Sequence, residues 1–141
     1  MQHLIRATWA AKWHDPALLF LRIATGMVFL THGWQKWQAG PELIGAFLNT
    51  LGFPIPEVLA VLLIGIEVFG GLALLFGVYT RLAAKITGIV AIVALLTVHV
   101  SKGYSATTGG YEYVLLLVAA CAILLVMGGG AWSVDKKVLK I

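Results

Sequence analysis

The stretch Val58 to Gly77 reads VLAVLLIGIEVFGGLALLFG, and Glu67 is its only ionisable residue. A run of this length can cross the hydrocarbon core of a bilayer as a helix, which takes about 20 residues. A carboxylate near the middle of such a helix costs about 2.5 to 3.5 kcal/mol on insertion scales, so we expect it to face a partner or a cavity. The stretch therefore predicts a membrane helix that carries a buried site.

Three further apolar runs of similar length flank this one. The predicted membrane helices cover residues 16–37, 58–79, 82–101 and 111–131. The connections between the second and third runs and between the third and fourth are short, which makes neighbouring helices antiparallel. We therefore expect an all-α protein, an integral membrane antiparallel four-helix bundle with up-down-up-down order, formed by a single membrane domain over residues 1–141.

The composition agrees with this class. Hydrophobic residues make up 60% of the chain, charged residues 11%, and the mean hydropathy is +0.95, which excludes an ordinary soluble domain. The formal net charge of +4 does not indicate nucleic acid, because the basic residues lie beside apolar runs and suit a membrane surface. The only cysteine, Cys121, excludes a disulfide framework and a paired-thiol site, and we expect it to be a small apolar residue.

Basic residues near helix ends predict the orientation, because they favour the cytoplasmic side. One side carries Arg6, Lys12, Arg81, Lys85, Lys136, Lys137 and Lys140. The other side carries only Lys36 and Lys102, so both termini should be cytoplasmic. An N-terminal repeat of Ile5, Trp9 and Trp13 predicts an interfacial helix. The stretch 43–51 predicts a loop helix that covers the outer end of the bundle.

Polar residues of the first helix form a stripe that includes Arg22, Gly33 and Lys36. Arg22 lies within side-chain reach of Glu67 at a rise of about 1.5 Å per residue, so we expect an ion pair between these two residues. A second, outer cluster is predicted from three helices. Its members are His32, Gln35, Lys36, His99 and Glu112.

Each group has a structural and a functional interpretation. The inner pair could simply join two helices, and the outer residues could simply sit at the membrane interface. As a site, the outer cluster suits a quinone headgroup, with His32, His99 and Glu112 as catalytic, proton-handling groups. Further cofactor-binding candidates are Arg22, Gln35, Lys36 and Glu67. A haem between His32 and His99 or a non-haem metal is an alternative with weaker support, because no close histidine spacing occurs.

Several motifs in order resemble the DoxX family of small bacterial membrane proteins. They are LFLRIATGMVFLTHGWQKW at residues 19–37, GFPIP at 52–56, IEVFGGLALLFGVYTR at 66–81, His99, and GGYE at 109–112. The resemblance implies a four-helix protein of the bacterial inner membrane. It also implies that the matching polar positions, Arg22, His32, Gln35, Lys36, Glu67, His99 and Glu112, belong to the family pattern, and that some relatives work with redox enzymes.

Two functions of different class follow from these observations. The first is a membrane redox subunit that binds quinone or another small cofactor at the outer end of the bundle and works with a partner oxidoreductase. The second is a non-enzymatic anchor or assembly subunit whose buried charges are structural. The small residues Ala83, Thr87 and Ala91 also allow close helix contact, within the chain or in a homo-oligomer.

Overall fold

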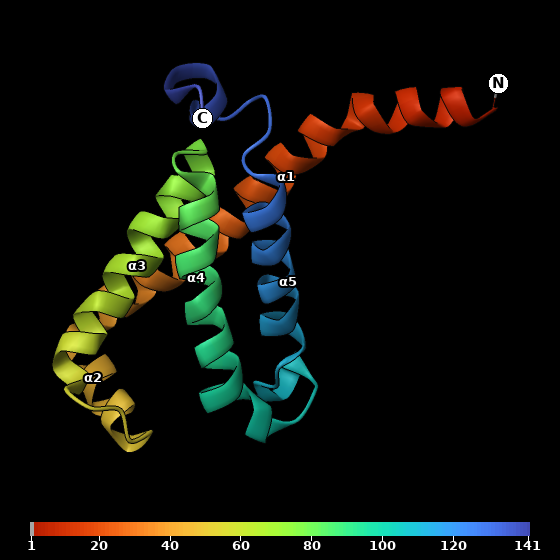
Figure 1. Ribbon diagram of the computed structural model, residues 1–141. Helices are drawn as coiled ribbons and strands as arrows, with labels where there is room; N and C mark the ends of the chain where they lie inside the picture. The colour runs from red at the N-terminus through yellow and green to blue at the C-terminus, as the bar shows by residue number, and fades with distance from the viewer. Residues whose placement is uncertain (1) are drawn as a thin grey trace.

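The computed structural model describes the backbone of residues 2–141 and the side chains of residues 11–141. This part of the chain contains helices and turns and no β-strand (Figure 1). The α-helices are α1 (Gln2–Ala39), α2 (Pro41–Thr50), α3 (Pro56–Phe76), α4 (Thr80–Ala94) and α5 (Glu112–Met127). The predicted all-α class is confirmed.

The long helices pack side by side. The main contacts join α1 to α3, α3 to α4, and α4 to α5. The segments Ala11–Ala39, Pro56–Phe76 and Thr80–Lys102 are long and apolar enough to cross a membrane, while α5 is shorter. Both chain termini lie at one end of the bundle, called here the proximal end, and α2 lies at the other, the distal end (Figure 1).

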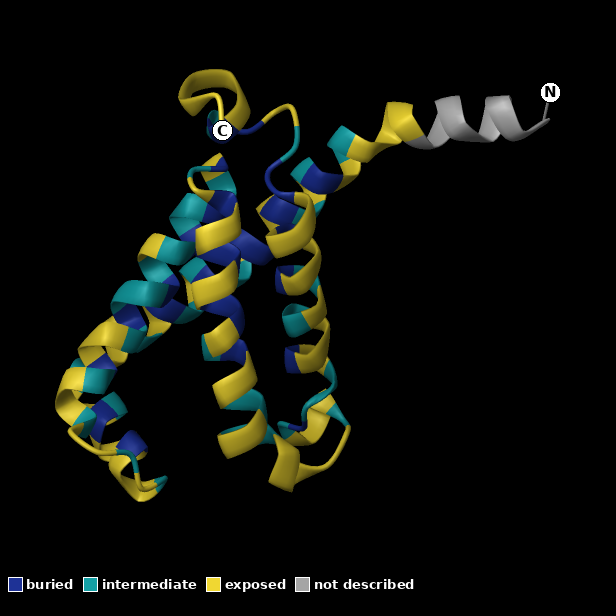
Figure 2. Cartoon of the chain, in the orientation of Figure 1, coloured by how far each residue is buried: buried dark blue, intermediate teal, exposed yellow. Residues whose placement is uncertain are grey.

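Apolar side chains cover the outside of the bundle as well as its interior. Phe20 is 77% exposed, Phe69 73% and Leu116 70%. The buried residues lie on the sides of the helices that face one another (Figure 2). Large apolar side chains on an outer surface of this extent suit hydrocarbon rather than water, and the chain is therefore a membrane protein.

Glycines let α1 and α3 approach until their backbones touch. A Cβ added to Gly71 would lie 2.6 Å from the Leu30 nitrogen and 2.8 Å from the Gly26 oxygen, and one added to Gly33 would lie 2.8 Å from the Val68 nitrogen. Such contacts leave no room for a side chain. The face of α1 that the sequence predicts to be polar and small is thus the face that meets α3.

Small residues also build the contact between α4 and α5. Ala84, Thr87 and Gly88 are buried, and a Cβ on Gly88 would lie 3.1 Å from the Cβ of Cys121. The Cys121 sulfur lies 3.8 Å from the Thr87 hydroxyl oxygen. Cys121 is 2% exposed, which confirms its interpretation as a small packing residue.

Several helix boundaries differ from the expected ones, among them the end of α3 at Phe76 rather than at residue 79. Helix α5 ends at Met127 rather than at residue 131, because Gly128 adopts a φ of +79° that ends the helix and two more glycines follow. Helix α4 begins at Thr80 and not at residue 82, since Asp135 accepts hydrogen bonds from the first amides of that helix. At its other end α4 continues into a π-helical turn, η1 (Leu95–His99), and a short 3-10 turn, η2 (Val100–Lys102).

The two expected surface helices have mixed outcomes. The N-terminal segment is not a separate helix, because α1 runs unbroken through Pro16, and its first part extends away from the other helices (Figure 1). The side chains of Ile5 and Trp9 lie outside the described residues. The loop helix forms as α2, but it packs mainly beside α3. Since α2 lies away from α5, it does not cover the whole outer end of the bundle as the sequence predicted (Figure 1).

Candidate functional site

Glu67 forms an ion pair with Lys36, not with Arg22. The Lys36 Nζ lies 2.8 Å from Oε1 and 2.6 Å from Oε2 of Glu67. The side chain of Glu67 is 7% exposed and that of Lys36 28%. A Cβ on Gly33 would lie 2.9 Å from the Glu67 Cβ, so α1 meets α3 at the depth of this carboxylate. The expected burial of Glu67 against a cation is confirmed, but the predicted cation is wrong.

Arg22 instead binds the loop that follows α5. Its Nη1 donates to the Gly129 oxygen at 2.9 Å, and its Nη2 donates to the Trp132 oxygen at 3.2 Å. The Asp135 carboxylate is near enough to attract the same guanidinium. Arg22 is 2% exposed and fixes the proximal end of the bundle. Arg22 thus binds backbone oxygens beyond the end of α5, whereas the sequence analysis expected it to bind Glu67.

His32 contacts α5 and lies near two other basic groups. Its ring meets the ring of Tyr113 edge-on, with centroids 6.2 Å apart and planes at 60°. Lys36 and His99 are both close enough to act on the His32 imidazole electrostatically. Residues of α1 and α5 are therefore in contact here, and His99 of η1 and Lys36 lie within electrostatic range of the same ring. We call His32, Lys36, Glu67, His99 and Tyr113 the distal cluster.

His99 is the last residue of the π-helical turn η1 and is half-buried. Its Nδ1 lies 2.7 Å from the Gly109 oxygen. A carbonyl oxygen can only accept, so Nδ1 carries the hydrogen in this bond and Nε2 of the neutral ring keeps its lone pair. A π-helical turn changes the direction of the side chains that follow it and is frequent at functional sites. The turn thus presents an imidazole that can accept a proton.

Glu112 and Gln35 are not joined to the distal cluster by any contact among the described residues. Glu112 Oε1 accepts a hydrogen bond of 2.6 Å from the Ala106 amide, so this carboxylate braces the loop before α5. Gln35 is exposed on α1. Within residues 11–141, no three His, Cys, Asp or Glu side chains come together as metal ligands. The catalytic role of Glu112 and the cofactor-binding role of Gln35 stay predictions.

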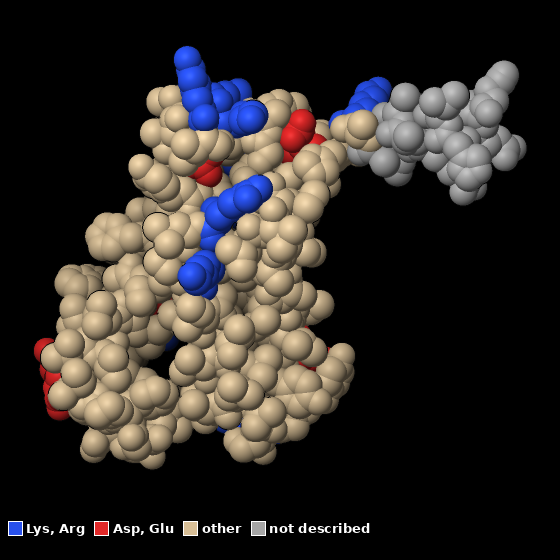
Figure 3. Space-filling view, in the orientation of Figure 1, with Lys and Arg blue, Asp and Glu red and all other residues tan. Residues whose placement is uncertain are grey.

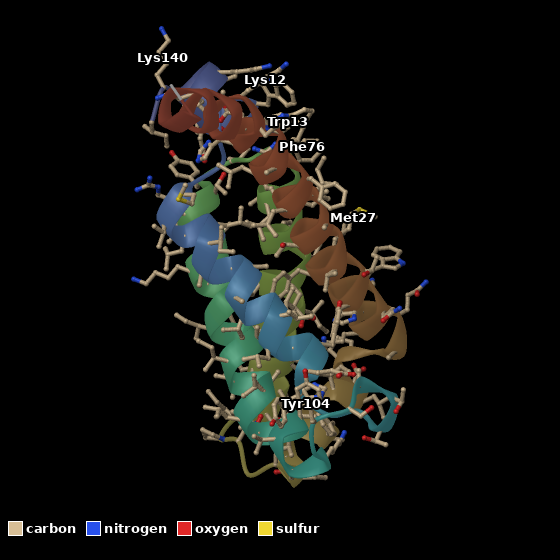
Figure 4. All side chains as sticks on the ribbon, turned by 90° about the vertical axis from the view of Figure 1, so that its right-hand side faces the viewer. Lys12, Trp13, Met27, Phe76, Tyr104 and Lys140 are labelled. Carbon is tan, nitrogen blue, oxygen red and sulfur yellow. The ribbon has the colours of Figure 1, made fainter. Side chains whose placement is uncertain are left out.

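Sequence reasoning missed Tyr113 and two aspartates. Tyr113 directly follows Glu112, and its helical direction relative to His32 is the signal that could have identified it. Asp135 accepts hydrogen bonds from the Thr80 amide at 2.8 Å and the Tyr79 amide at 2.5 Å, and Asp15 accepts one of 2.9 Å from the Ala131 amide. Asp15 is two residues from Trp13 and Asp135 five from Lys140, and Figure 4 shows Trp13 and Lys140 at the proximal end, opposite Tyr104.

A family model, DoxX, matches residues 17–100, which contain Arg22, His32, Lys36, Glu67 and His99. The chain belongs to the DoxX family. It is 30% identical to the Bacillus subtilis protein named "Putative oxidoreductase CatD", over 92% of each chain. It is 29% identical to the Escherichia coli "Inner membrane protein YqjF", over 89% of this chain and 94% of that one.

A protein of Haemophilus influenzae with no assigned function is 30% identical to this chain, over 89% of it and 85% of the relative. No solved structure matches the chain. The relatives thus extend the likeness over nearly the whole chain, beyond the residues of the family model, and the name of YqjF agrees with a membrane location.

Proposed function

We propose that this DoxX family protein is a membrane subunit that binds the headgroup of a quinone in the distal cluster and works with a partner oxidoreductase. The observation that carries the proposal is the contact between His32 of α1 and Tyr113 of α5, with His99 and the paired Lys36 within electrostatic range of His32. Titratable groups that gather in one part of an apolar bundle suit a small-molecule site. The name of CatD adds redox chemistry in a related protein.

Interconversion of a quinone and its quinol moves two electrons and two protons. In this proposal the electrons pass to or from the partner, and the two imidazoles exchange the protons, because an imidazole nitrogen can both take up and release a proton. Since Nδ1 of His99 donates to Gly109, its Nε2 can accept from the quinol, and the Tyr113 hydroxyl can donate to a quinone oxygen. The Lys36 and Glu67 pair keeps a charge of each sign beside the headgroup.

We also infer that α5 completes a fourth crossing, so that both termini face the cytoplasm of a bacterial inner membrane. The proximal end carries Arg81, Lys85, Lys136, Lys137 and Lys140, the excess of basic residues that marks the cytoplasmic side (Figure 3). The distal cluster then lies in the outer half of the bundle. A quinone there would be reached from the outer leaflet.

The binding test uses the full chain in lipid nanodiscs with added ubiquinone-1 or menadione. Quinone binding should quench the fluorescence of Trp34 and Trp37, which lie on α1 next to the cluster. The variants His32→Gln and His99→Gln should each weaken binding by about tenfold, as expected for one lost hydrogen bond of about 1.5 kcal/mol. The matched control is His14→Gln, because His14 is exposed near the proximal end.

Equal binding by His99→Gln and the control would exclude the quinone site. An anchor or assembly subunit is then the better function, and one observation favours it. The Lys36 and Glu67 pair joins α1 to α3, and the Arg22 bonds join α1 to the loop after α5, as expected of groups that fix helices. Copurification of an oxidoreductase with a quinone-free chain supports that alternative.

A further inference from the structure

A cavity of about 720 Å³ opens at the proximal end. It lies between the start of α4, the loop of Gly128, Gly129 and Gly130, and the C-terminal segment. This loop has no side chains of its own to fill the space. A Cβ on Gly129 would lie 2.6 Å from the Thr80 Oγ1, so only glycine can pack against that buried hydroxyl. The cavity is therefore a property of the glycine loop.

The ionisable groups of the cavity divide into engaged carboxylates and available cations. Asp135 accepts from the Thr80 amide at 2.8 Å, and Asp15 accepts from the Ala131 amide at 2.9 Å. The side chains of Arg81 and Lys136 also line the cavity, and neither has an ion-pair or hydrogen-bond partner among the described residues. Thr80 Oγ1 is fully buried without a partner. Arg81 and Lys136 thus offer positive charge to a negative group in the cavity.

An apolar groove continues from this cavity along α3 and α4. Its volume is about 540 Å³, and it shares Tyr79 and Leu82 with the cavity. Its walls include Gly65, Phe69 and Ile86, and a Cβ on Gly65 would meet nothing within 4 Å. The groove lies in the apolar part of α3 and α4, where a hydrocarbon chain is the natural filling.

We propose that the cavity and the groove together bind one anionic phospholipid. Its phosphate contacts Arg81 and Lys136, and one acyl chain lies in the groove beside Gly65. Two cations without partners at headgroup depth, next to an apolar groove, match both ends of such a lipid. Basic side chains run over the proximal end and down one face of the bundle (Figure 3). Charge and shape thus agree on the same occupant.

The test is titration of the detergent-purified full chain with dioleoyl phosphatidylglycerol, dioleoyl phosphatidylcholine or glycerol phosphate, read by native mass spectrometry. We expect one phosphatidylglycerol per chain, bound about tenfold more tightly than phosphatidylcholine. The double variant Arg81→Gln with Lys136→Gln should weaken that binding about tenfold. The matched control is Lys85→Gln with Lys137→Gln, which removes the same charge from residues that do not line the cavity.

The groove is tested by filling it. Gly65→Leu should weaken the binding of both phospholipids. Ala119→Leu, on an exposed part of α5, should leave the binding of both unchanged. If Gly65→Leu does not fold by circular dichroism, Phe69→Ala tests the groove instead, because it removes an exposed wall at little cost to packing.

Three outcomes overturn the proposal. If the Arg81 and Lys136 double variant and the Lys85 and Lys137 double variant lose affinity for phosphatidylglycerol equally, surface charge alone explains the binding. If glycerol phosphate binds as tightly as phosphatidylglycerol and neither groove variant changes the affinity, the ligand of the cavity is a soluble anion. If Gly65→Leu still binds phosphatidylglycerol but loses a copurified quinone or no longer dimerises, the groove has another occupant.

Discussion

Lys36 on α1 holds Glu67 on α3 through both carboxylate oxygens, at 2.8 Å and 2.6 Å. The pair crosses an interface where glycines bring the two helix backbones into contact. The carboxylate is almost completely buried in a helix of otherwise apolar residues, so its charge depends on this lysine. The same lysine lies within electrostatic range of His32. The structural pair and the candidate site are therefore one unit.

Removal of either partner should destabilise the protein more than removal of both. Glu67→Gln and Lys36→Met should each lower the free energy of unfolding by about 2 kcal/mol, because one charge is left unpaired in an apolar region. The double variant should lose only about 1 kcal/mol, which corresponds to a coupling of about 3 kcal/mol. Thermal or SDS unfolding of the four proteins in mixed micelles measures this cycle.

The control cycle combines Glu67→Gln with Arg22→Gln. Arg22 bonds to Gly129 and Trp132 and not to Glu67, so these two losses should add. A coupling between Arg22 and Glu67 equal to that of the Lys36 cycle would contradict the structure.

The sequence predicted most of the helices because hydropathy and length alone decide them, as Glu67 in its apolar run shows. It could not assign the partner of Glu67. Helical spacing gives the face of a residue, but the estimate of reach from Arg22 used the rise per residue alone, which does not place two helices relative to each other. Arg22 binds backbone oxygens of Gly129 and Trp132, and backbone acceptors carry no sequence signature. The end of α5 was misplaced for a related reason, because Gly128 lies within a run that is apolar throughout.

Arg22 should be sensitive even to a conservative change. Arg22→Lys should lower the unfolding free energy by about 2 kcal/mol, because an ammonium cannot bond two carbonyl oxygens with the geometry of a guanidinium. The loop from Gly128 to Trp132 should open first. Limited proteolysis at this loop, compared between Arg22→Lys and the wild-type chain, measures the effect, and unchanged cleavage would contradict it.

Two glycines of α3 should respond in opposite ways to alanine. Gly71→Ala should destabilise the protein by about 1 to 3 kcal/mol, because its Cβ would lie 2.6 Å from the Leu30 nitrogen. Gly65→Ala should be neutral or slightly stabilising, since its Cβ meets nothing within 4 Å and alanine favours a helix. The melting temperatures of the two variants in one detergent test the contrast. Equal melting temperatures would argue against direct contact of the α1 and α3 backbones.

The number of crossings depends on α5, whose 16 residues span about 24 Å, less than the roughly 30 Å of a hydrocarbon core. The apolar residues that follow α5 and a locally thinner bilayer can supply the difference.

We expect a cysteine in place of exposed Lys102 to react with an impermeant maleimide on intact cells. One in place of exposed Lys137 should react only after permeabilisation, because the basic proximal end stays in the cytoplasm. Cys121→Ala supplies the background, since Cys121 is the chain's only cysteine. The reverse pattern would invert the topology, whereas reaction of both positions from the same side would mean that α5 does not cross.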